Sequence, residues 1–131
     1  MSVSVLIVDD QRPFRLAARA VVDATDGFEV IGEVETGEAS VEAARALQPD
    51  LVLMDVNLPG ISGLEATKRI LAESSARKPV VVVVLSTYEA AEYAPRAADA
   101  GATGYITKSE FSPVRLEAAW SEAHSAEAKP G

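Results

Sequence analysis

Three aspartates, Asp9, Asp10 and Asp55, lie at the ends of short aliphatic runs. Asp9 and Asp10 follow residues 3–8, and Asp55 follows residues 51–54. If both runs are parallel strands, their carboxyl ends share one edge of the sheet and bring the three carboxylates together. Because such carboxylates repel one another, the group would bind a cation or raise the pKa of one member. A set of hard oxygen ligands without His or Cys suits Mg²⁺.

Further polar residues follow later aliphatic runs. Ser86 and Thr87 come after residues 80–85, and Lys108 comes just after the last run. If these runs are neighbouring strands, a hydroxyl and an ammonium group join the carboxylates at the same edge. Carboxylate, metal and ammonium groups around one point suit phosphoryl transfer, in which catalysis is mostly positioning and charge stabilisation. Asp55 would then be the nucleophile, because carboxylates can form aspartyl-phosphate intermediates.

Five aliphatic or β-branched runs predict the strands that carry these residues. Three of them, residues 3–8, 51–54 and 80–85, are almost continuously apolar. Continuous runs are typical of strands that are covered on both faces in a parallel sheet. Two weaker runs, residues 28–34 and 103–106, complete the set.

Helix-compatible stretches separate the predicted strands. They cover residues 15–24, 38–47 and 64–73, and a last helix begins with Ser112 as N-cap and Pro113 in its first turn. Strand and helix therefore alternate along the chain. This alternation predicts an α/β fold, a three-layer sandwich with right-handed crossovers.

Residues 89–100 should form the fourth helix, but Pro95 lies among them. Proline lacks an amide donor, and its ring clashes with the carbonyl four residues earlier in a helix. The helix therefore either starts late, with Pro95 in its first turn, or is kinked at Pro95. We favour the late start, because Gly101 already marks the helix end.

Size and composition limit the class of protein. The chain has 131 residues, of which 48% are hydrophobic and 24% charged, which predicts one globular domain. The absence of Cys excludes disulfide scaffolds, thiolate zinc sites and cysteine nucleophiles. A net charge of −8 argues against a nucleic-acid surface, which would need a basic footprint.

Membrane insertion and secretion are also unexpected. The longest apolar run, residues 80–85, has six residues, far fewer than a membrane span needs. The first residues lack the basic region and apolar stretch of a signal peptide. We therefore expect a cytoplasmic protein.

Four motifs together resemble the receiver domain of bacterial two-component response regulators. They are residues 8–10 (Val-Asp-Asp), 54–63 (Met-Asp-Val-Asn-Leu-Pro-Gly-Ile-Ser-Gly), 85–87 (Leu-Ser-Thr) and 101–108 (Gly-Ala-Thr-Gly-Tyr-Ile-Thr-Lys). The resemblance spans about residues 3–120 and is closest to receivers that usually precede a helix-turn-helix output domain. It implies a five-stranded parallel sheet in the flavodoxin-like order 2-1-3-4-5, with helices on both faces.

The resemblance implies roles for the acidic residues. Asp55 resembles the phospho-acceptor of the family. Asp9 and Asp10 resemble the acidic pair that holds Mg²⁺, directly or through water. Asp55 and the backbone carbonyl of Asn57 resemble the remaining protein ligands of that ion.

The resemblance also implies a switch. Ser86 is similar to the hydroxyl residue that moves toward the phosphoryl group, and Thr87 lies one residue beyond it. Tyr105 resembles the aromatic residue that turns inward on activation, and Lys108 resembles the lysine that pairs with the phosphate. Taken singly, these residues are ordinary turn or surface residues. Their coincidence at one sheet edge favours the functional interpretation.

The resemblance further implies partners and an activity. The phosphoryl donor would be a phosphohistidine of a sensor histidine kinase, and the chain would act as a signalling switch, not as an enzyme for a separate substrate. We expect a receiver domain over residues 1–124 and a short polar tail over residues 125–131, with no output domain in these residues. The switch would act on a downstream protein target or on a missing output domain. A homodimer through the fourth and fifth helices is a further option, and direct nucleic-acid binding is not expected.

Two other functions remain open at this point. A Mg²⁺-dependent phosphatase of the haloacid-dehalogenase type would also use an Asp nucleophile, but that family expects an acid where Asn57 stands. A protein-interaction module that has lost the chemistry is the other alternative. The intact acids, hydroxyl and lysine argue against such a loss.

Several residues depart from the family pattern or have simpler roles. Ser109 follows Lys108, where the family often has a proline with a cis bond, so the sequence does not predict the course of this loop. Arg12, Arg15 and Arg19 form a basic edge on the first helix. The resemblance includes that helix in the kinase-docking surface, although a solvated face is the simpler interpretation. Trp120 is expected to anchor the last helix in the core, and His124 is given no function.

Overall fold

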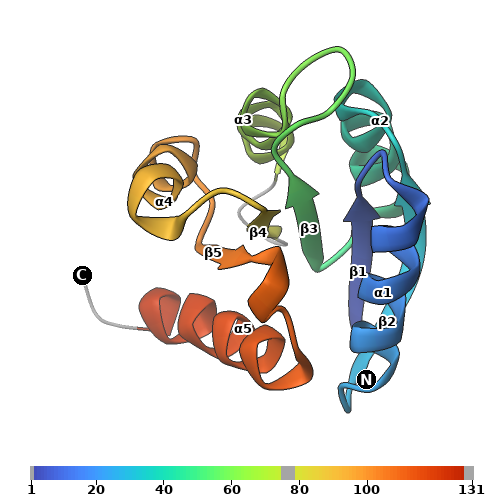
Figure 1. The fold of residues 1–131 in the computed structure, drawn as a ribbon, viewed down its shortest axis with the longest axis vertical. Coiled ribbons are helices and arrows are strands. Elements are labelled where there is room, and N and C mark those ends of the chain that lie inside the picture. The colour runs from blue at the N-terminus through green and yellow to red at the C-terminus, as the bar shows by residue number, and fades with distance from the viewer. Residues whose placement is uncertain (1, 75–78, 129–131) are drawn as a thin grey trace.

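The computed structural model describes residues 2–74 and 79–128, in which strands and helices alternate (Figure 1). The strands are β1 (Val3–Val8), β2 (Phe28–Val34), β3 (Leu51–Asp55), β4 (Val81–Ser86) and β5 (Gly104–Thr107). The α-helices are α1 (Arg12–Asp23), α2 (Gly37–Leu47), α3 (Gly63–Glu73), α4 (Ala90–Asp99) and α5 (Pro113–Ala128), and a 3₁₀ turn, η1, covers Lys108–Glu110.

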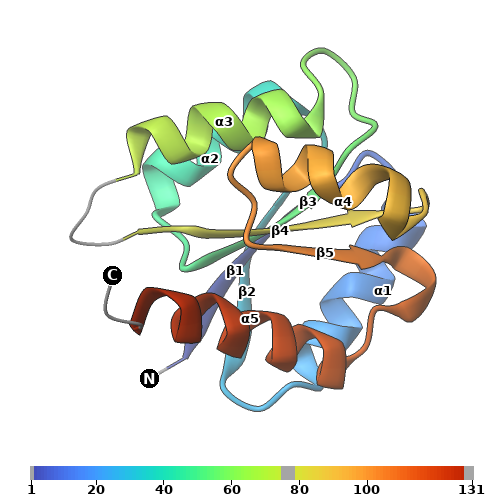
Figure 2. The same ribbon diagram turned by 90° about the vertical axis from the view of Figure 1, so that its left-hand side faces the viewer.

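The five strands form one parallel sheet in the order β2-β1-β3-β4-β5, as expected. Helices α1 and α5 cover one face, and α2, α3 and α4 cover the other (Figure 2). The three-layer α/β sandwich is therefore confirmed. Since all strands run in one direction, their carboxyl ends lie along a single edge, where the polar residues named above follow the strands.

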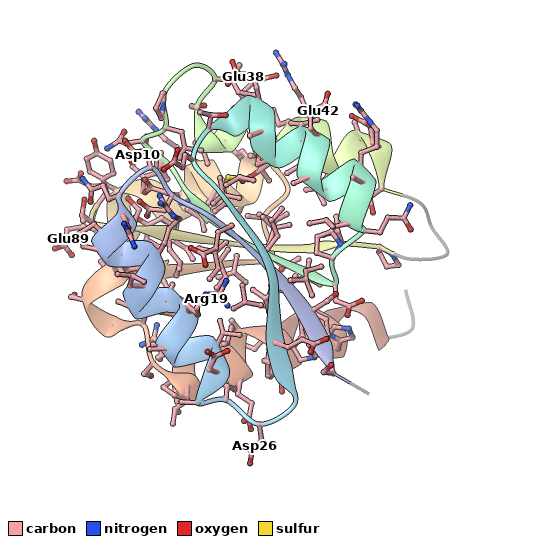
Figure 3. All side chains as sticks on the ribbon, turned by 90° about the vertical axis from the view of Figure 1, so that its right-hand side faces the viewer. Asp10, Arg19, Asp26, Glu38, Glu42 and Glu89 are labelled. Atoms are coloured by element: carbon pink, nitrogen blue, oxygen red, sulfur yellow. The ribbon has the colours of Figure 1, made fainter. Side chains whose placement is uncertain are left out.

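Helix α1 begins at Arg12, three residues before the start that the apolar pattern predicts. Pro13 lies in its first turn, where a proline fits because the amide that it lacks has no helical partner there. Figure 3 shows Asp10 in the connection that leads into α1 and Arg19 on the helix itself. The early start therefore leaves a very short turn between β1 and α1.

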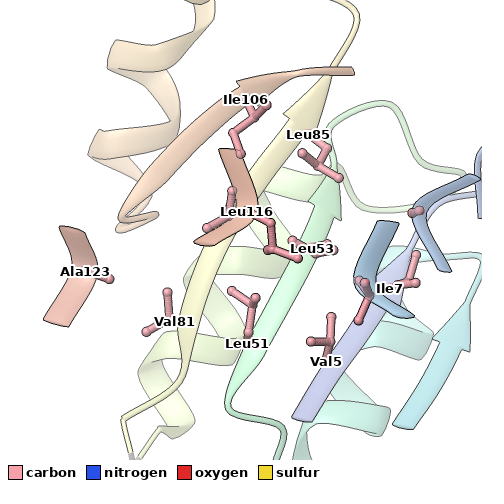
Figure 4. Close-up of a cluster of buried hydrophobic side chains, with 12 residues drawn as sticks. Val5, Ile7, Leu51, Leu53, Val81, Leu85, Ile106, Leu116 and Ala123 are labelled. Carbon is pink, nitrogen blue, oxygen red and sulfur yellow. The ribbon is translucent and has the colours of Figure 1, made fainter. Parts of the chain in front are cut away.

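Both faces of the sheet carry apolar side chains, as continuous strands require. Alternate residues of one strand belong to opposite layers, so that Val5 and Ile7 pack toward α1 and α5 while Leu6 packs toward α2 and α3. Figure 4 shows the first of these clusters, where Leu116 of α5 lies against the central strands. Leu116 is fully buried, which contributes on the order of 2 kcal/mol to folding.

Helix α4 begins at Ala90, so the predicted late start with Pro95 in the first turn is wrong. Pro95 lies inside the helix and leaves the carbonyl of Ala91 without its usual amide donor. Both residues are exposed, so water can satisfy that carbonyl at little cost. The helix ends where expected, because Gly101 has a φ of +103°, a left-handed conformation that favours glycine.

Helix α5 continues beyond Trp120 to Ala128, which makes residues 125–128 of the expected tail helical. Residues 129–131 lie outside the described residues. Trp120 packs against the core and meets Phe28 edge-on, with ring centroids 6.1 Å apart, as an anchor residue should. Among the described residues, no helix combines the length and the apolar character that crossing a membrane requires.

Candidate functional site

The sheet brings the three predicted carboxylates together. Each of Asp9, Asp10 and Asp55 offers an oxygen, and these oxygens all lie within 4.8 Å of one another. Asp9 and Asp10 follow the end of β1, and Asp55 is the last residue of the neighbouring strand β3. The expectation that they meet at one edge is therefore confirmed, whereas their roles remain predictions.

Asp9 is the most deeply buried member of this cluster. It is 1% exposed, compared with 7% for Asp55, while Asp10 is exposed to solvent. The Oδ1 atom of Asp9 accepts a hydrogen bond from the amide of Gln11 at 2.8 Å. Its Oδ2 atom accepts one from the Nζ atom of Lys108 at 2.6 Å. Two donors thus hold this carboxylate in one orientation.

The ammonium group of Lys108 lies between two acids and an aromatic ring. Its Nζ atom is 3.5 Å from Oδ1 of Asp55, in addition to the shorter contact with Asp9. It also lies 4.3 Å from the ring centroid of Phe14, within the range of a cation–π interaction. Lys108 begins the turn η1, and the described residues include no cis peptide bond, so the loop does not need the cis proline of the family. The sequence pattern does not single out Phe14, because nothing in its type or spacing indicates this contact.

The surroundings of Asp55 raise the pKa of its carboxyl group to about 6. Burial is the largest cause, and the negative charge of Asp9 is the second. The charge of Lys108 and hydrogen bonds from Lys108 and the Val56 amide act in the opposite direction. An added cation would offset the repulsion between these acids, so the donor set of three carboxylates fits Mg²⁺.

The loop after Asp55 is closely tied to the rest of the domain. The amide of Gly63 donates to the carbonyl of Val56 at 2.9 Å, and a Cβ atom on Gly63 would lie 1.8 Å from the carbonyl oxygen of Asp55. Glu38 of α2 accepts a hydrogen bond from the amide of Ile61 at 3.2 Å. The close approach of the Asp55 carbonyl oxygen leaves room only for glycine at position 63.

Asn57 lies in this loop and contacts the neighbouring one. Its Nδ2 atom donates to the hydroxyl of Tyr88 at 2.9 Å. Neither the type nor the spacing of Tyr88 indicates this contact, although the residue lies two positions after Ser86. The structure positions the backbone carbonyl of Asn57 in the loop that follows the acid cluster, and its role as a metal ligand stays a prediction.

The predicted switch residues occupy different environments. Ser86 is 1% exposed, and its Oγ atom accepts a hydrogen bond from the amide of Tyr88 at 3.1 Å. Thr87 is exposed. Tyr105 is partly buried, its hydroxyl donates to the carbonyl of Tyr88 at 2.7 Å, and burial raises the pKa of its phenol. Tyr88 in turn stacks on Tyr93 with centroids 4.8 Å apart, so the β4–α4 loop links Ser86, Tyr105 and α4.

Arg15 does not form part of a solvated basic face. Its side chain is 12% exposed and makes ion pairs with Glu33 at 3.4 Å and Glu35 at 3.1 Å. Arg19 is paired with Glu33 as well, at 2.7 Å. The simpler interpretation of this edge is therefore wrong for Arg15, because the end of β2 supplies carboxylates that neutralise it.

Curated relatives of this chain are response regulators. Response regulator GacA of Pseudomonas viridiflava is 41% identical over 106 residues, which are 81% of this chain and 48% of that protein. Response regulator UvrY of Escherichia coli O6:H1 is 39% identical over 106 residues, 81% of this chain and 47% of that protein. The chain thus spans about half the length of the curated relatives that it matches.

Similarity to solved structures and to a protein family also relates this chain to response regulators. A two-component response regulator of the LuxR family from Aurantimonas sp. SI85-9A1 matches with a TM-score of 0.83 and 28% identity, over 96% of this chain and 87% of that chain. The family match covers residues 5–121 and is described as the response regulator receiver domain. On this evidence, together with the fold and the acid cluster, the chain belongs to the response regulator receiver domain family.

Proposed function

We propose that this receiver domain is a phosphorylation-dependent switch in which Asp55 accepts a phosphoryl group from a sensor histidine kinase. The observation that carries the proposal is the setting of Asp55, a nearly buried carboxylate with two acids and one ammonium group around it. Packing alone gives no reason to gather three carboxylates at one point, because their charges repel one another. Binding of a cation and of a phosphoryl group does give such a reason.

The transfer is a displacement at phosphorus. A carboxylate oxygen of Asp55 attacks the phosphorus atom of a phosphohistidine, so that a P–O bond forms and the P–N bond to the imidazole breaks. The leaving imidazole keeps the bonding electron pair and is protonated by water. At pH 7 the Asp55 carboxyl, with a pKa of about 6, is mostly ionised and ready to attack. Attack of water on the aspartyl phosphate later releases inorganic phosphate and restores Asp55.

Mg²⁺ is the cofactor that these residues fit. Asp9, Asp10 and Asp55, with the backbone carbonyl of Asn57, would hold it. When bound, the ion supplies positive charge that stabilises the oxygens of the transferring phosphoryl group. Lys108, 3.5 Å from Asp55, supplies a second positive charge on the protein itself.

Phosphorylation of Asp55 would change the conformation of the β4–α4 loop. Ser86 would donate a hydrogen bond to the new phosphoryl group, and its present contact with the Tyr88 amide would then change. Tyr105 holds the carbonyl of the same residue, so a movement of the loop alters the packing of the tyrosine side chains. Phosphorylation would thus bias an equilibrium between two arrangements of this surface, with Thr87 as an exposed member of the moving segment.

The proposed partners follow from this scheme. A sensor histidine kinase supplies the phosphoryl group, and a downstream protein or an output domain responds to the altered surface. We include homodimerisation through α4 and α5 in the proposal, as one response to the altered surface. Sedimentation of the phosphorylated and unphosphorylated domain would test that pairing, and an unchanged monomer in both states would remove it from the scheme.

Intact mass spectrometry tests the proposed chemistry. The parent domain and the Asp55→Asn variant are incubated with phosphoramidate or acetyl phosphate, with Mg²⁺ or with a chelator. We expect the parent to gain one phosphoryl group only when Mg²⁺ is present, and the variant to gain none.

The alternative function predicts a different result. If the parent is folded by circular dichroism and gains no phosphoryl group from either donor, the domain is a protein-interaction module without the chemistry. A gain that persists in Asp55→Asn would assign the acceptor to another residue. Either result would contradict the proposal.

A further inference from the structure

Arg15 connects the acid cluster to the end of strand β2. One terminal nitrogen of its guanidinium donates to the backbone carbonyl of Asp9 at 2.8 Å. The other nitrogens pair with Glu33 and Glu35, at 3.4 and 3.1 Å. With its side chain 12% exposed, Arg15 bridges the β1–α1 turn and the end of β2 instead of extending into solvent.

The carbonyl that Arg15 holds belongs to the peptide between Asp9 and Asp10. Because a peptide unit is planar, fixing its oxygen also fixes the orientation of the plane that joins the two Cα atoms. The directions of both aspartate side chains depend on that plane. The Asp9 carboxylate is further held by the Gln11 amide, so the turn is restrained both at its backbone and at a side chain.

We propose that Arg15 is a positioning residue for the metal site, acting through the Asp9 carbonyl without touching the ion. This inference rests on the proposed function, since it concerns the ligands named there. Groups that orient metal ligands typically change metal affinity by about 10- to 100-fold when they are replaced. The role requires an arginine, because its planar fork can serve three acceptors at once, whereas a lysine is a single point charge.

Arg19 provides a matched control on the same helix. It pairs with Glu33 at 2.7 Å, so both arginines share one partner. Among the contacts of the described residues, only Arg15 of these two arginines also bonds to the β1–α1 turn. If the arginines serve stability alone, Arg15→Lys and Arg19→Lys should have equal effects on metal binding. If Arg15 positions the turn, only its replacement should weaken Mg²⁺ binding.

The test measures two quantities for the parent, Arg15→Lys and Arg19→Lys. Mg²⁺ affinity is measured by isothermal titration calorimetry, and the exchange rate of the Gln11 amide is measured by NMR without metal. We expect Arg15→Lys to bind Mg²⁺ about tenfold more weakly and to exchange the Gln11 amide faster. Arg19→Lys should stay within about twofold of the parent in both measurements.

Equal Mg²⁺ affinities and equal Gln11 exchange rates in the two variants would overturn the proposal. If Arg15→Lys fails to fold, the double variant Glu33→Gln/Glu35→Gln removes both carboxylate partners of Arg15, and Gln11 exchange as slow as in the parent would then overturn the proposal. Failure of the proposed phosphoryl transfer gives a different result, because it is seen as no gain of mass in the parent, whereas a parent that binds no Mg²⁺ would show that the metal site itself is absent. The metal-free exchange measurement still reports on Arg15 in that case.

Discussion

Two ion pairs of this domain lie in opposite environments. Lys108 and Asp9 are 11% and 1% exposed, and their contact closes the acid cluster at the carboxyl ends of the strands. Arg45 of α2 and Glu73 of α3 are 55% and 43% exposed, and they form two parallel hydrogen bonds of 2.8 and 3.0 Å. By contact geometry alone, the exposed pair is the better formed of the two.

The difference lies in charge balance. Arg45 has a second acid, Glu42, at 3.3 Å, but all of these groups are solvated and water screens their interactions. At the carboxyl ends of the strands, two buried carboxylates, those of Asp9 and Asp55, contact one ammonium group, and an oxygen of the exposed Asp10 lies within 4.8 Å of both. Burial without balancing charge disfavours the ionised carboxylate, and burial together with the charge of Asp9 raises the pKa of Asp55. Such an arrangement is typical of a functional site, here one that would bind a cation and an anionic phosphoryl group.

The largest expected effect is that of Lys108→Ala at the buried edge. This substitution leaves Asp9 buried without its cationic partner, which should lower the free energy of unfolding by about 3 kcal/mol at pH 7. Urea denaturation followed by circular dichroism measures the change. A loss below about 1 kcal/mol would mean that Asp9 is solvated and that the two pairs are alike.

The pH dependence of the free energy of unfolding should reveal how much stability is lost when the Asp55 carboxyl group ionises. Its pKa is about 6 in the folded protein, above the ordinary value of 3.8, so the folded state holds this proton more tightly than the unfolded chain. That contribution to stability is fully present below about pH 4 and is lost as the pH rises through 6. Without metal, Asp55→Asn should therefore gain about 2 to 3 kcal/mol over the parent between pH 4 and pH 7.

Another outcome of this experiment would contradict the contrast between the acid cluster and the exposed Arg45–Glu73 pair. A difference between Asp55→Asn and the parent that stays constant across this pH range would show that Asp55 titrates normally. Ionisation of Asp55 would then cost the folded state no stability, and the acid cluster would resemble the exposed pair in this respect.

Mg²⁺ should stabilise the buried edge by a smaller amount. At ten times its dissociation constant, a ligand that binds only the folded state adds about 1.4 kcal/mol to the free energy of unfolding. We expect this gain in the parent and its loss in Asp10→Asn, in which an exposed ligand is replaced without disturbing the core. Thermal unfolding with and without Mg²⁺ measures it, and an equal gain in both proteins would exclude Asp10 as a ligand.

The smallest effect should come from the exposed pair. Arg45→Gln removes the contacts with Glu73 and Glu42, yet all three side chains are solvated and replaceable by water. We expect the urea midpoint and the Mg²⁺ affinity of this variant to match those of the parent. A clear loss of either would show that the α2–α3 contact supports the acid cluster.

The sequence predicts the positions of the strands and of the acids because both depend on local patterns. Continuous aliphatic runs require burial on both faces, and Asp9 and Asp55 directly follow such runs. The start of α4 is predicted less well. Pro95 removes a hydrogen bond at an exposed position, where water can satisfy the freed carbonyl, and the helix starts before the proline.

Contacts between distant loops could not be predicted in the same way. Lys108 lies closer to Asp9 than to Asp55, although the resemblance pairs it with the phosphoryl group. Arg15 donates to the Asp9 carbonyl while glutamates at the end of β2 pair with its other nitrogens. Such contacts depend on how loops are placed after folding, which neither periodicity nor residue type reveals.

Chemical mapping of the phosphoryl group tests the identity of the acceptor most directly. The domain is treated with phosphoramidate and Mg²⁺ and then reduced with borohydride, which converts an aspartyl phosphate to homoserine. Peptide mass spectrometry then locates the converted residue. We expect conversion at Asp55 alone, with Asp9 and Asp10 unchanged. Conversion at Asp9 or Asp10, or at no aspartate in a folded and phosphorylated protein, would contradict the assignment of Asp55 as the acceptor.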